Sequence, residues 1–137
     1  GRQIKTVGID RRAVGKNIRG DNLKLLPIMN LSGFDIIDID TYGQPIRQIE
    51  AIFNNKTRRV GTIVFYTFIQ TWFGGLNEQM LKECGYTQPM QKKIKSIFRP
   101  LGFGCFKQFI ARRGVETIYD YEINKGQSVK HYGCFEI

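Results

Sequence analysis

The stretch FDIIDIDTYGQP, residues 34–45, decides how this chain folds, because it contains the pattern of a strand, the point where that strand ends and the turn that follows. Its first half is mostly apolar, which predicts a buried strand. Asp38 and Asp40 interrupt the apolar run, and the TYGQP segment that follows has the glycine and proline of a turn. Two carboxylates and the ring of Tyr42 therefore lie where a core strand stops.

Strands and helices alternate on both sides of this stretch. Residues 4–10 predict a strand that ends at Asp10. Residues 11–33 have helix-like content that Gly15 and Gly20 interrupt, with Asp21 or Asn22 as the cap of a helix through Asn30. Residues 45–55 have apolar side chains at helical spacing behind a proline, and the apolar run 60–69 predicts a third strand. This alternation predicts βαβ units and a mainly parallel sheet.

The last third of the chain has a different pattern. A mixed helical region covers about residues 75–113. The segments VETIYDYEI and SVKHYGCFEI then flank NKGQ, and Gly126 in that link is typical of a hairpin turn. We expect one α/β domain over residues 1–137, whose parallel sheet is closed by an antiparallel hairpin.

The charge balance favours a polyanionic partner. Lys and Arg number 21 against 12 acidic residues, a formal charge of +9, and nucleic acid is the first candidate. The basic residues interleave with phenylalanines that we expect to be mostly buried, and a solvated helix face remains the alternative. The candidate nucleic-acid-binding residues are Lys92, Lys93, Lys95, Arg99, Arg112 and Arg113.

The cysteines favour neither a zinc site nor a disulfide framework. Cys84, Cys105 and Cys134 are odd in number and widely spaced, and the chain has one histidine. No apolar segment approaches the roughly 20 residues that cross a bilayer. We expect a protein of the reducing cytoplasm that has no membrane partner.

Polar residues follow each predicted strand, and in an open α/β sheet ligands bind beyond the carboxyl ends of the strands. A strand-end acid can accept hydrogen bonds from both hydroxyls of a ribose, and Asp21 can accept one from a purine amine. The duller alternatives are helix caps at Asp10 and Asp21 and a turn at Asp38. The residues expected along this rim are Asp10, Asp38, Asp40, Gln70, Thr71 and Trp72.

The order of these motifs resembles that of class I S-adenosylmethionine-dependent methyltransferases. VGID with RRAVGKN, then RGDNLKLLP, FDIIDIDTYGQP, a long apolar strand and a terminal hairpin cover nearly the whole chain. DIDTYGQP is similar to the Asp-Pro-Phe-Gly or Pro-Pro-Tyr segment of nucleic-acid amino methyltransferases, especially the tRNA guanine-N2 dimethyltransferases. The resemblance implies a Rossmann-like sheet with strand order 3-2-1-4-5-7-6, and methylation of a base amine, in RNA ahead of DNA.

The resemblance also implies roles for single residues. Asp10 would hold the ribose of S-adenosylmethionine, Asp21 its adenine, and Asp38 would lie on the same donor side. Asp40 would accept hydrogen bonds from the target amine, while Tyr42 stacks on a splayed-out base. The family has proline where this chain has Thr41, and Trp72 with Phe73 would form either an apolar lid or part of the core.

The family's first strand and its glycine-rich donor loop have no counterpart before residue 4. Without that strand, the strands ending at Asp10 and Asp38 lose their shared neighbour, and unpaired buried edges are costly. We expect an N-terminally truncated methyltransferase domain. The alternatives are direct pairing of these two strands, or a second chain that fills the gap.

Two other functions remain open at this stage. VGID with Asp38 and Asp40 also resembles the acidic cluster of a metal-dependent RNase-H-like nuclease, which needs a further carboxylate such as Glu50 or Glu116. The other is a non-enzymatic nucleic-acid-binding module with a degenerate methyltransferase fold. That module would bind nucleic acid in a salt-dependent way and ignore the donor.

Overall fold

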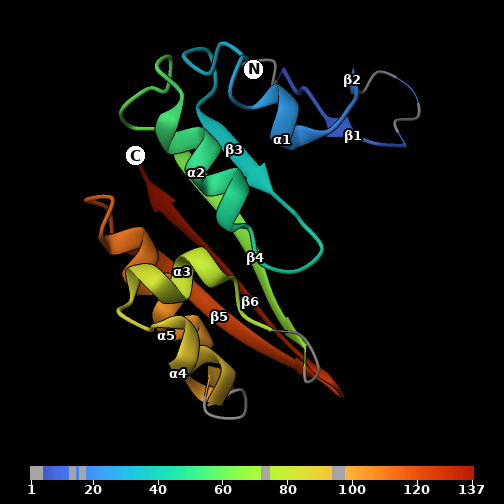
Figure 1. Cartoon of the computed structure of the whole chain (residues 1–137). Coiled ribbons are helices and arrows are strands. Elements are labelled where there is room, and N and C mark those ends of the chain that lie inside the picture. Colours follow the sequence, from blue (N-terminus) through green and yellow to red (C-terminus); the bar gives the residue numbers. More distant parts are fainter. Residues whose placement is uncertain (1–4, 13–14, 16–17, 72–74, 94–97) are drawn as a thin grey trace.

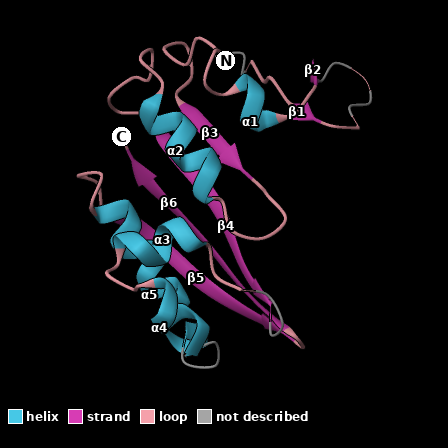
Figure 2. Ribbon diagram, in the orientation of Figure 1, coloured by secondary structure: helices cyan, strands magenta, loops and turns pink. Residues whose placement is uncertain are grey.

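A computed structural model describes residues 5–12, 15, 18–71, 75–93 and 98–137 of the chain. Two short strands come first, strands and helices then alternate from α1 to β4, and three successive helices precede a final hairpin (Figures 1 and 2). They are β1 Ile9–Asp10, β2 Ile18–Arg19, α1 Asn22–Leu25, β3 Ile36–Ile39, α2 Ile46–Asn54, β4 Ile63–Thr71, α3 Glu78–Glu83, α4 Gln88–Lys93, α5 Phe98–Ala111, β5 Thr117–Lys125 and β6 Ser128–Glu136.

The main sheet has four strands in the order β3-β4-β6-β5. β3 and β4 are parallel, whereas β6 is antiparallel to both β4 and β5. The fold is therefore mixed α/β, and the prediction of a mainly parallel sheet is wrong. The hairpin closes one edge of the sheet, as predicted, but β3 and β4 are the one parallel pair beside it, so most of the pairing in this sheet is antiparallel.

The hairpin itself is confirmed. β5 pairs with β6 from Thr117 to Lys125, with an irregularity between Thr117 and Tyr119. Gly126 in the connecting turn has φ 56°, a conformation that glycine adopts without the steric penalty of a Cβ.

α2 begins directly after Pro45, as predicted, and it connects β3 to β4 on one face of the sheet. Proline suits this position because its missing N–H has no partner in the first turn. The apolar stripe Ile46, Ile49 and Ile52 is 0% exposed, so one face of α2 is fully buried. Burial of each of these side chains stabilises the fold by about 1.5–3 kcal/mol.

The core lies between the sheet and the helices α2, α3 and α5. Every second residue of β4 points into it, among them Val64, Tyr66 and Phe68. The Phe106 ring of α5 contacts Tyr66 edge-on at 4.9 Å between centroids and Phe68 at 4.8 Å. Aromatic contacts at these distances add to the stabilisation that comes from burial alone.

The described helices of this layer lie on one face of the four-stranded sheet, in front of it in Figure 1. The residues of β4 that alternate with the core residues point to the other face, and Phe65 there is 43% exposed. On the same face of the hairpin, Tyr119 is 61% and Tyr121 46% exposed. No described helix lies over this face, although Thr67 and Cys134, which project from it, are only 6% and 9% exposed.

The N-terminal part differs from the prediction in two places. β1 is only Ile9–Asp10 among the described residues, and it pairs with β2 in a separate parallel two-stranded sheet. Ile18–Arg19 is thus a strand where a helix was expected. Direct pairing of the Asp10 strand with the Asp38 strand, one of the alternatives to truncation, is not observed in the described part of the chain.

α1 covers Asn22–Leu25. The prediction that this helix extends to Asn30 is wrong. Pro27 has no N–H to continue the helix. Asn55 instead fixes the following turn, because its side-chain amide donates to the backbone oxygens of Leu26 at 2.7 Å and Met29 at 2.9 Å. In the described residues, no helix has the length and apolarity needed to cross a membrane.

Candidate functional site

The segment after β3 is held against two other parts of the fold. The backbone oxygen of Gly43 accepts a hydrogen bond from Ile69 N in β4 at 2.7 Å. Gly43 has φ 102°, a conformation that strains any residue with a Cβ. The Gln44 side chain donates to Gly75 O at 2.9 Å and accepts from Asn77 N at 2.7 Å. The TYGQP turn is therefore anchored to β4 and to the start of α3.

This anchored turn presents a carboxylate and an aromatic ring to solvent. Asp40 follows the carboxyl end of β3 and is exposed. The Tyr42 side chain is 107% exposed, so neither face of its ring is buried by the described residues. The Thr41 hydroxyl is buried and has no hydrogen-bond partner in the described part of the chain. The expected site residues Asp40 and Tyr42 thus lie together on one fixed turn.

Asp38 lies on the open face of the sheet rather than on the rim. It pairs with Phe65 in the register of β3 and β4, so its side chain points away from the helices. Partial burial raises the pKa of Asp38, and the nearby charge of Asp40 raises it further. Two carboxylates this close on one strand end leave an acidic spot on a basic protein.

The expected donor-binding acids are occupied by local contacts. Asp21 caps α1 by accepting from Leu23 N at 3.0 Å, and its second oxygen pairs with Arg11 at 3.0 Å. The bond from Leu23 N is the main reason that the pKa of Asp21 is lowered, and the charge of Arg11 adds to it. Asp10 accepts from Arg12 N at 2.6 Å with one oxygen. The helix-cap alternative is confirmed for Asp21. At Asp10 it is wrong, because a turn and not a helix follows this residue.

The expected rim is assembled only in part. Asp40 and Tyr42 follow β3, while Asp10 ends a strand of the other sheet. Gln70 is 7% exposed, and Thr71 ends β4 at the surface. Trp72 and Phe73, the expected lid, lie outside the described residues.

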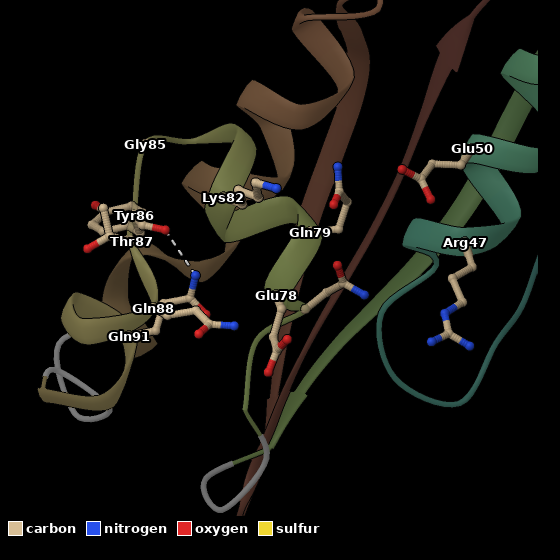
Figure 3. A pocket seen from close by; sticks show the side chains of 11 residues that line it. Arg47, Glu50, Glu78, Gln79, Lys82, Gly85, Tyr86, Thr87, Gln88 and Gln91 are labelled. Atoms are coloured by element: carbon tan, nitrogen blue, oxygen red, sulfur yellow. Dashed lines mark hydrogen bonds between the residues drawn. The ribbon is translucent and has the colours of Figure 1, made fainter.

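A cavity of about 900 Å³ lies between α2 and the α3–α4 segment (Figure 3). Arg47 and Glu50 of α2 form one wall, and Glu78 and Lys82 of α3 lie opposite, together with Tyr86. The lining residues carry both signs of charge. The turn residues Asp40 and Tyr42 are not among those that line it.

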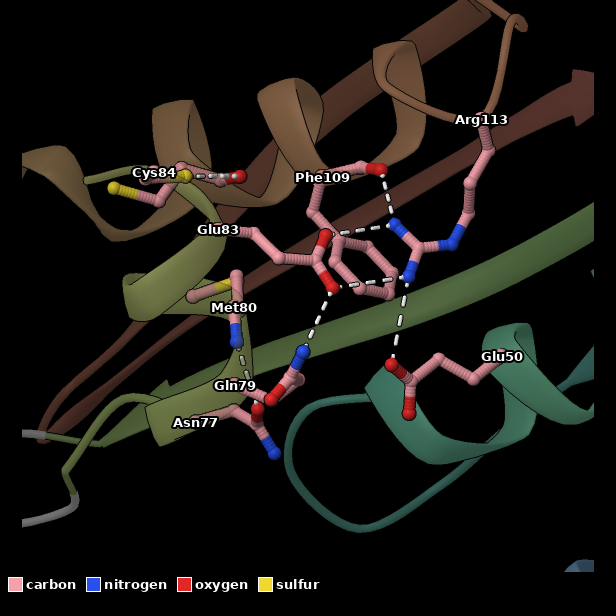
Figure 4. A network of polar contacts seen from close by, with 9 residues as sticks. Glu50, Asn77, Gln79, Met80, Glu83, Cys84, Phe109 and Arg113 are labelled. Carbon is pink, nitrogen blue, oxygen red and sulfur yellow. Dashed lines mark hydrogen bonds and ion pairs between the residues drawn. The ribbon is translucent and has the colours of Figure 1, made fainter. Parts of the chain in front are cut away.

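Arg113, an expected nucleic-acid contact, belongs to an internal network (Figure 4). Its guanidinium pairs with Glu83 at 3.0 Å and Glu50 at 3.4 Å, donates to Phe109 O at 2.7 Å, and lies over the Phe109 ring. Burial alone would raise the pKa of Glu83, but hydrogen bonds from Arg113 and Gln79 outweigh it and lower that pKa. The network connects α2, α3 and the end of α5, so Arg113 is not free for phosphate.

The other basic candidates are distributed differently. Lys92 and Arg112 are exposed, and Lys93 and Arg99 belong to α4 and α5. Lys95 lies outside the described residues. Phe106 and Phe109, expected to be buried between the charges, are 0% exposed, as predicted.

The carboxylates expected for the nuclease alternative do not form a metal site among the described residues. Glu50, one of its two candidate carboxylates, is paired with Arg113. No group of three or more His, Cys, Asp or Glu side chains in the described part of the chain could hold a metal ion. All three cysteines are free thiols, and burial raises the pKa of Cys105 to about 11, which disfavours its reactive thiolate.

Sequence reasoning missed Gln44, which is the anchor of the turn. Its partners, Gly75 and Asn77, lie 31 and 33 residues later, so no local pattern indicates them. The glycine of the TYGQP segment was a signal for the turn but not for its attachment to β4.

Comparison with known proteins assigns no family to this chain, so a functional proposal rests on the geometry described above. No protein-family model matches the chain. A search of curated proteins finds no significant match.

Proposed function

We propose that this chain forms the base-binding part of an S-adenosylmethionine-dependent methyltransferase that acts on an exocyclic amine of a nucleic-acid base, in RNA ahead of DNA. The observation that carries the proposal is the anchored turn, on which Asp40 and Tyr42 are two residues apart and both exposed. A flat ring open on both sides suits a base that has left its stack, and a fixed carboxylate suits an amine on that base.

The sheet order supports the same proposal. The strand order β3-β4-β6-β5 is compatible with positions 4-5-7-6 of the sheet order that the resemblance implies. The turn with Asp40 then follows the strand at position 4. Among the described residues β3 pairs only with β4, so its second edge is where the strand at position 1 would pair.

The residues expected to hold the donor fit it poorly. Both oxygens of Asp21 and one oxygen of Asp10 already accept hydrogen bonds, and Asp38 points to the open face. S-adenosylmethionine, when bound, supplies an electrophilic methyl group. We therefore assign the described residues to base recognition.

The chain's own contribution is orientation. The Asp40 carboxylate accepts a hydrogen bond from the target amine and thereby fixes the direction of the nitrogen lone pair. The Tyr42 ring stacks on the base and holds it outside the nucleic-acid helix. Such a stacking contact is worth about 1–3 kcal/mol per base. Gln44 and Gly43 keep the two groups in fixed relative positions.

The test is transfer of a labelled methyl group from S-adenosylmethionine to RNA, with donor binding measured by calorimetry. Asp40→Asn should lower the rate about 100-fold, because misoriented reacting groups cost that much. Asp35→Asn removes a carboxylate just before β3 and is the matched control. Tyr42→Phe should keep the activity that Tyr42→Ala loses.

Two outcomes contradict the proposal. Transfer at the wild-type rate by Asp40→Asn would remove its orienting role. A wild-type chain that binds RNA in a salt-dependent way, without donor binding or transfer, would be the degenerate binding module instead.

A further inference from the structure

We propose that the cavity between α2 and the α3–α4 segment binds one nucleotide of the RNA, next to the base that the Asp40 turn holds; this rests on the proposed function. The cavity has a volume of about 900 Å³, within the range of about 300–1,000 Å³ that is usual for ligand sites. Its lining comes from α2, from α3 and from the residues up to Gln91 in α4 (Figure 3).

The cavity begins where the TYGQP turn is attached to the rest of the fold. The backbone N–H of Asn77, which lines the cavity, donates to the side-chain oxygen of Gln44 at 2.7 Å. Arg47, another lining residue, follows Gln44 by three residues and belongs to the first turn of α2. The turn that presents Asp40 and Tyr42 is therefore a neighbour of the cavity. An RNA strand that places one base on the turn can place the adjoining nucleotide in the cavity.

Two cations lie on facing sides of the cavity, Arg47 on α2 and Lys82 on α3 (Figure 3). Both are exposed, and neither side chain forms an ion pair or a hydrogen bond with another residue that the structure describes. Each has a carboxylate about one helical turn away, at Glu50 and Glu78, but Glu50 is paired with Arg113 instead. A phosphate in the cavity would gain charge-assisted hydrogen bonds from both cations.

The other charges of the lining favour a single nucleotide over a long stretch of backbone. The carboxylates of Glu50 and Glu78 also line the cavity, so its charged side chains balance. A groove that tracks many phosphates is positively charged along its length, and these carboxylates interrupt such a track. Among the described residues Glu78 has no cationic partner, so it can accept a hydrogen bond from a ribose hydroxyl or a base amine.

Side-chain amides provide the groups that recognise a base. Gln79 donates to the carboxylate of Glu83 at 3.1 Å, and Gln91 donates to the backbone oxygen of Tyr86 at 3.0 Å. These contacts orient both amides and leave their oxygens for a ligand. The amide of Gln88 has no partner in the described part of the chain. Because amides pair with the edges of bases, adenine above all, the lining suits the unpaired base of a single strand.

The salt dependence of RNA binding tests the phosphate contact. Fluorescence anisotropy measures the affinity of the chain for a labelled oligoadenylate at several salt concentrations, without the methyl donor. The double variant Arg47→Gln, Lys82→Gln should bind about tenfold more weakly. It should also lower the slope of log affinity against log salt by about 0.7, because one phosphate contact to a single strand is lost. Lys56→Gln removes an exposed lysine just beyond the other end of α2 and should change neither quantity.

The base contact has a separate readout. The wild type should bind oligoadenylate more tightly than oligouridylate, and Gln88→Ala should weaken oligoadenylate binding about tenfold. The salt slope of Gln88→Ala should stay that of the wild type, because the variant keeps both cations. Equal affinities of the wild type for the two oligomers would contradict recognition of a base in the cavity. Urea midpoints equal to that of the wild type show that the variants are folded.

Three further results decide the proposal. A double variant with the affinity and salt slope of the wild type overturns it, and the proposed function still stands if methyl transfer depends on Asp40. A double variant that loses affinity, in a chain that transfers no methyl group, supports the nucleotide site and contradicts the proposed function. Adenosine monophosphate that competes as strongly as the oligomer would make the cavity a site for free nucleotides, so the assignment to RNA would be wrong.

Discussion

The two faces of the sheet carry similar residues but have different surroundings. On the covered face, Phe68 and Phe135 are 0% exposed beneath α2 and α5. On the open face, Tyr119 is 61% exposed although it lies in the same sheet. Apolar composition of a strand therefore identifies a face that needs a cover, but the cover has to come from another element.

The largest test of this comparison is one aromatic truncation on each face. Phe106→Ala should lower the free energy of unfolding by about 3–5 kcal/mol, because its ring is fully buried between Tyr66 and Phe68. Tyr121→Ala should cost less than about 1 kcal/mol, because its ring is 46% exposed. Urea denaturation at low protein concentration measures both, and equal losses would contradict the difference between the faces.

The sequence predicted the elements better than the way they assemble. The helix behind Pro45, the long apolar strand and the hairpin with Gly126 follow from local spacing and turn chemistry, and all are present. The position of β6 beside β4 does not, because strand order depends on contacts between distant segments. The local sequence does not distinguish a strand with one covered face from a strand with two covered faces.

The candidate site shows the same division. Asp40 and Tyr42 were recognisable because acids and aromatics at a strand end stand out in an apolar context. Asp21 was equally recognisable, but its carboxylate accepts a hydrogen bond from Leu23 N as a helix cap and also pairs with Arg11. Gln44, whose contacts fix the turn, lies in no recognisable pattern because its partners are distant in sequence.

Arg112 and Arg113 offer a matched pair at the edge of the covered layer. Arg113→Met should cost about 1–3 kcal/mol, because Glu50 and Glu83 keep their charges and lose their hydrogen-bond partner. Arg112→Met removes an exposed charge and should stay within about 0.5 kcal/mol. Thermal or urea unfolding distinguishes them, and a larger effect at Arg112 would be inconsistent with the network.

Two glycines test how tightly the covered side is packed. A Cβ at Gly133 would lie 2.6 Å from the backbone oxygen of Tyr119 and 2.4 Å from the Tyr66 hydroxyl. Gly133→Ala should therefore cost about 1–3 kcal/mol. Gly104 lies on α5 with nothing within 4 Å of a Cβ, so Gly104→Ala should gain about 0.5–1 kcal/mol from helix propensity. Equal urea midpoints for the two variants would contradict this packing.

The smallest expected effect is a pH dependence from His131 on the covered face. Its imidazole stacks on the Phe103 ring at 3.8 Å between centroids, with an angle of 5° between the planes. Burial lowers the pKa of His131 below 6.5. The carboxylates of Glu122 and Asp120 oppose this shift, and the charge of Lys107 adds to it.

The direction of this pH dependence follows from the order of protonation: as the pH falls, the unfolded chain binds the proton before the folded chain does. Between the folded pKa of His131 and 6.5, the unfolded state is protonated while the folded state is neutral. The stability that this neutral ring contributes is complete above 6.5 and falls as the pH falls toward the folded pKa. Because the chain has one histidine, no other side chain with an ordinary pKa titrates between about pH 5 and 6.5. His131→Phe keeps the stacking and should flatten the dependence of the urea midpoint on pH in this window. A variant that loses stability as steeply as the wild type would place the titrating group elsewhere.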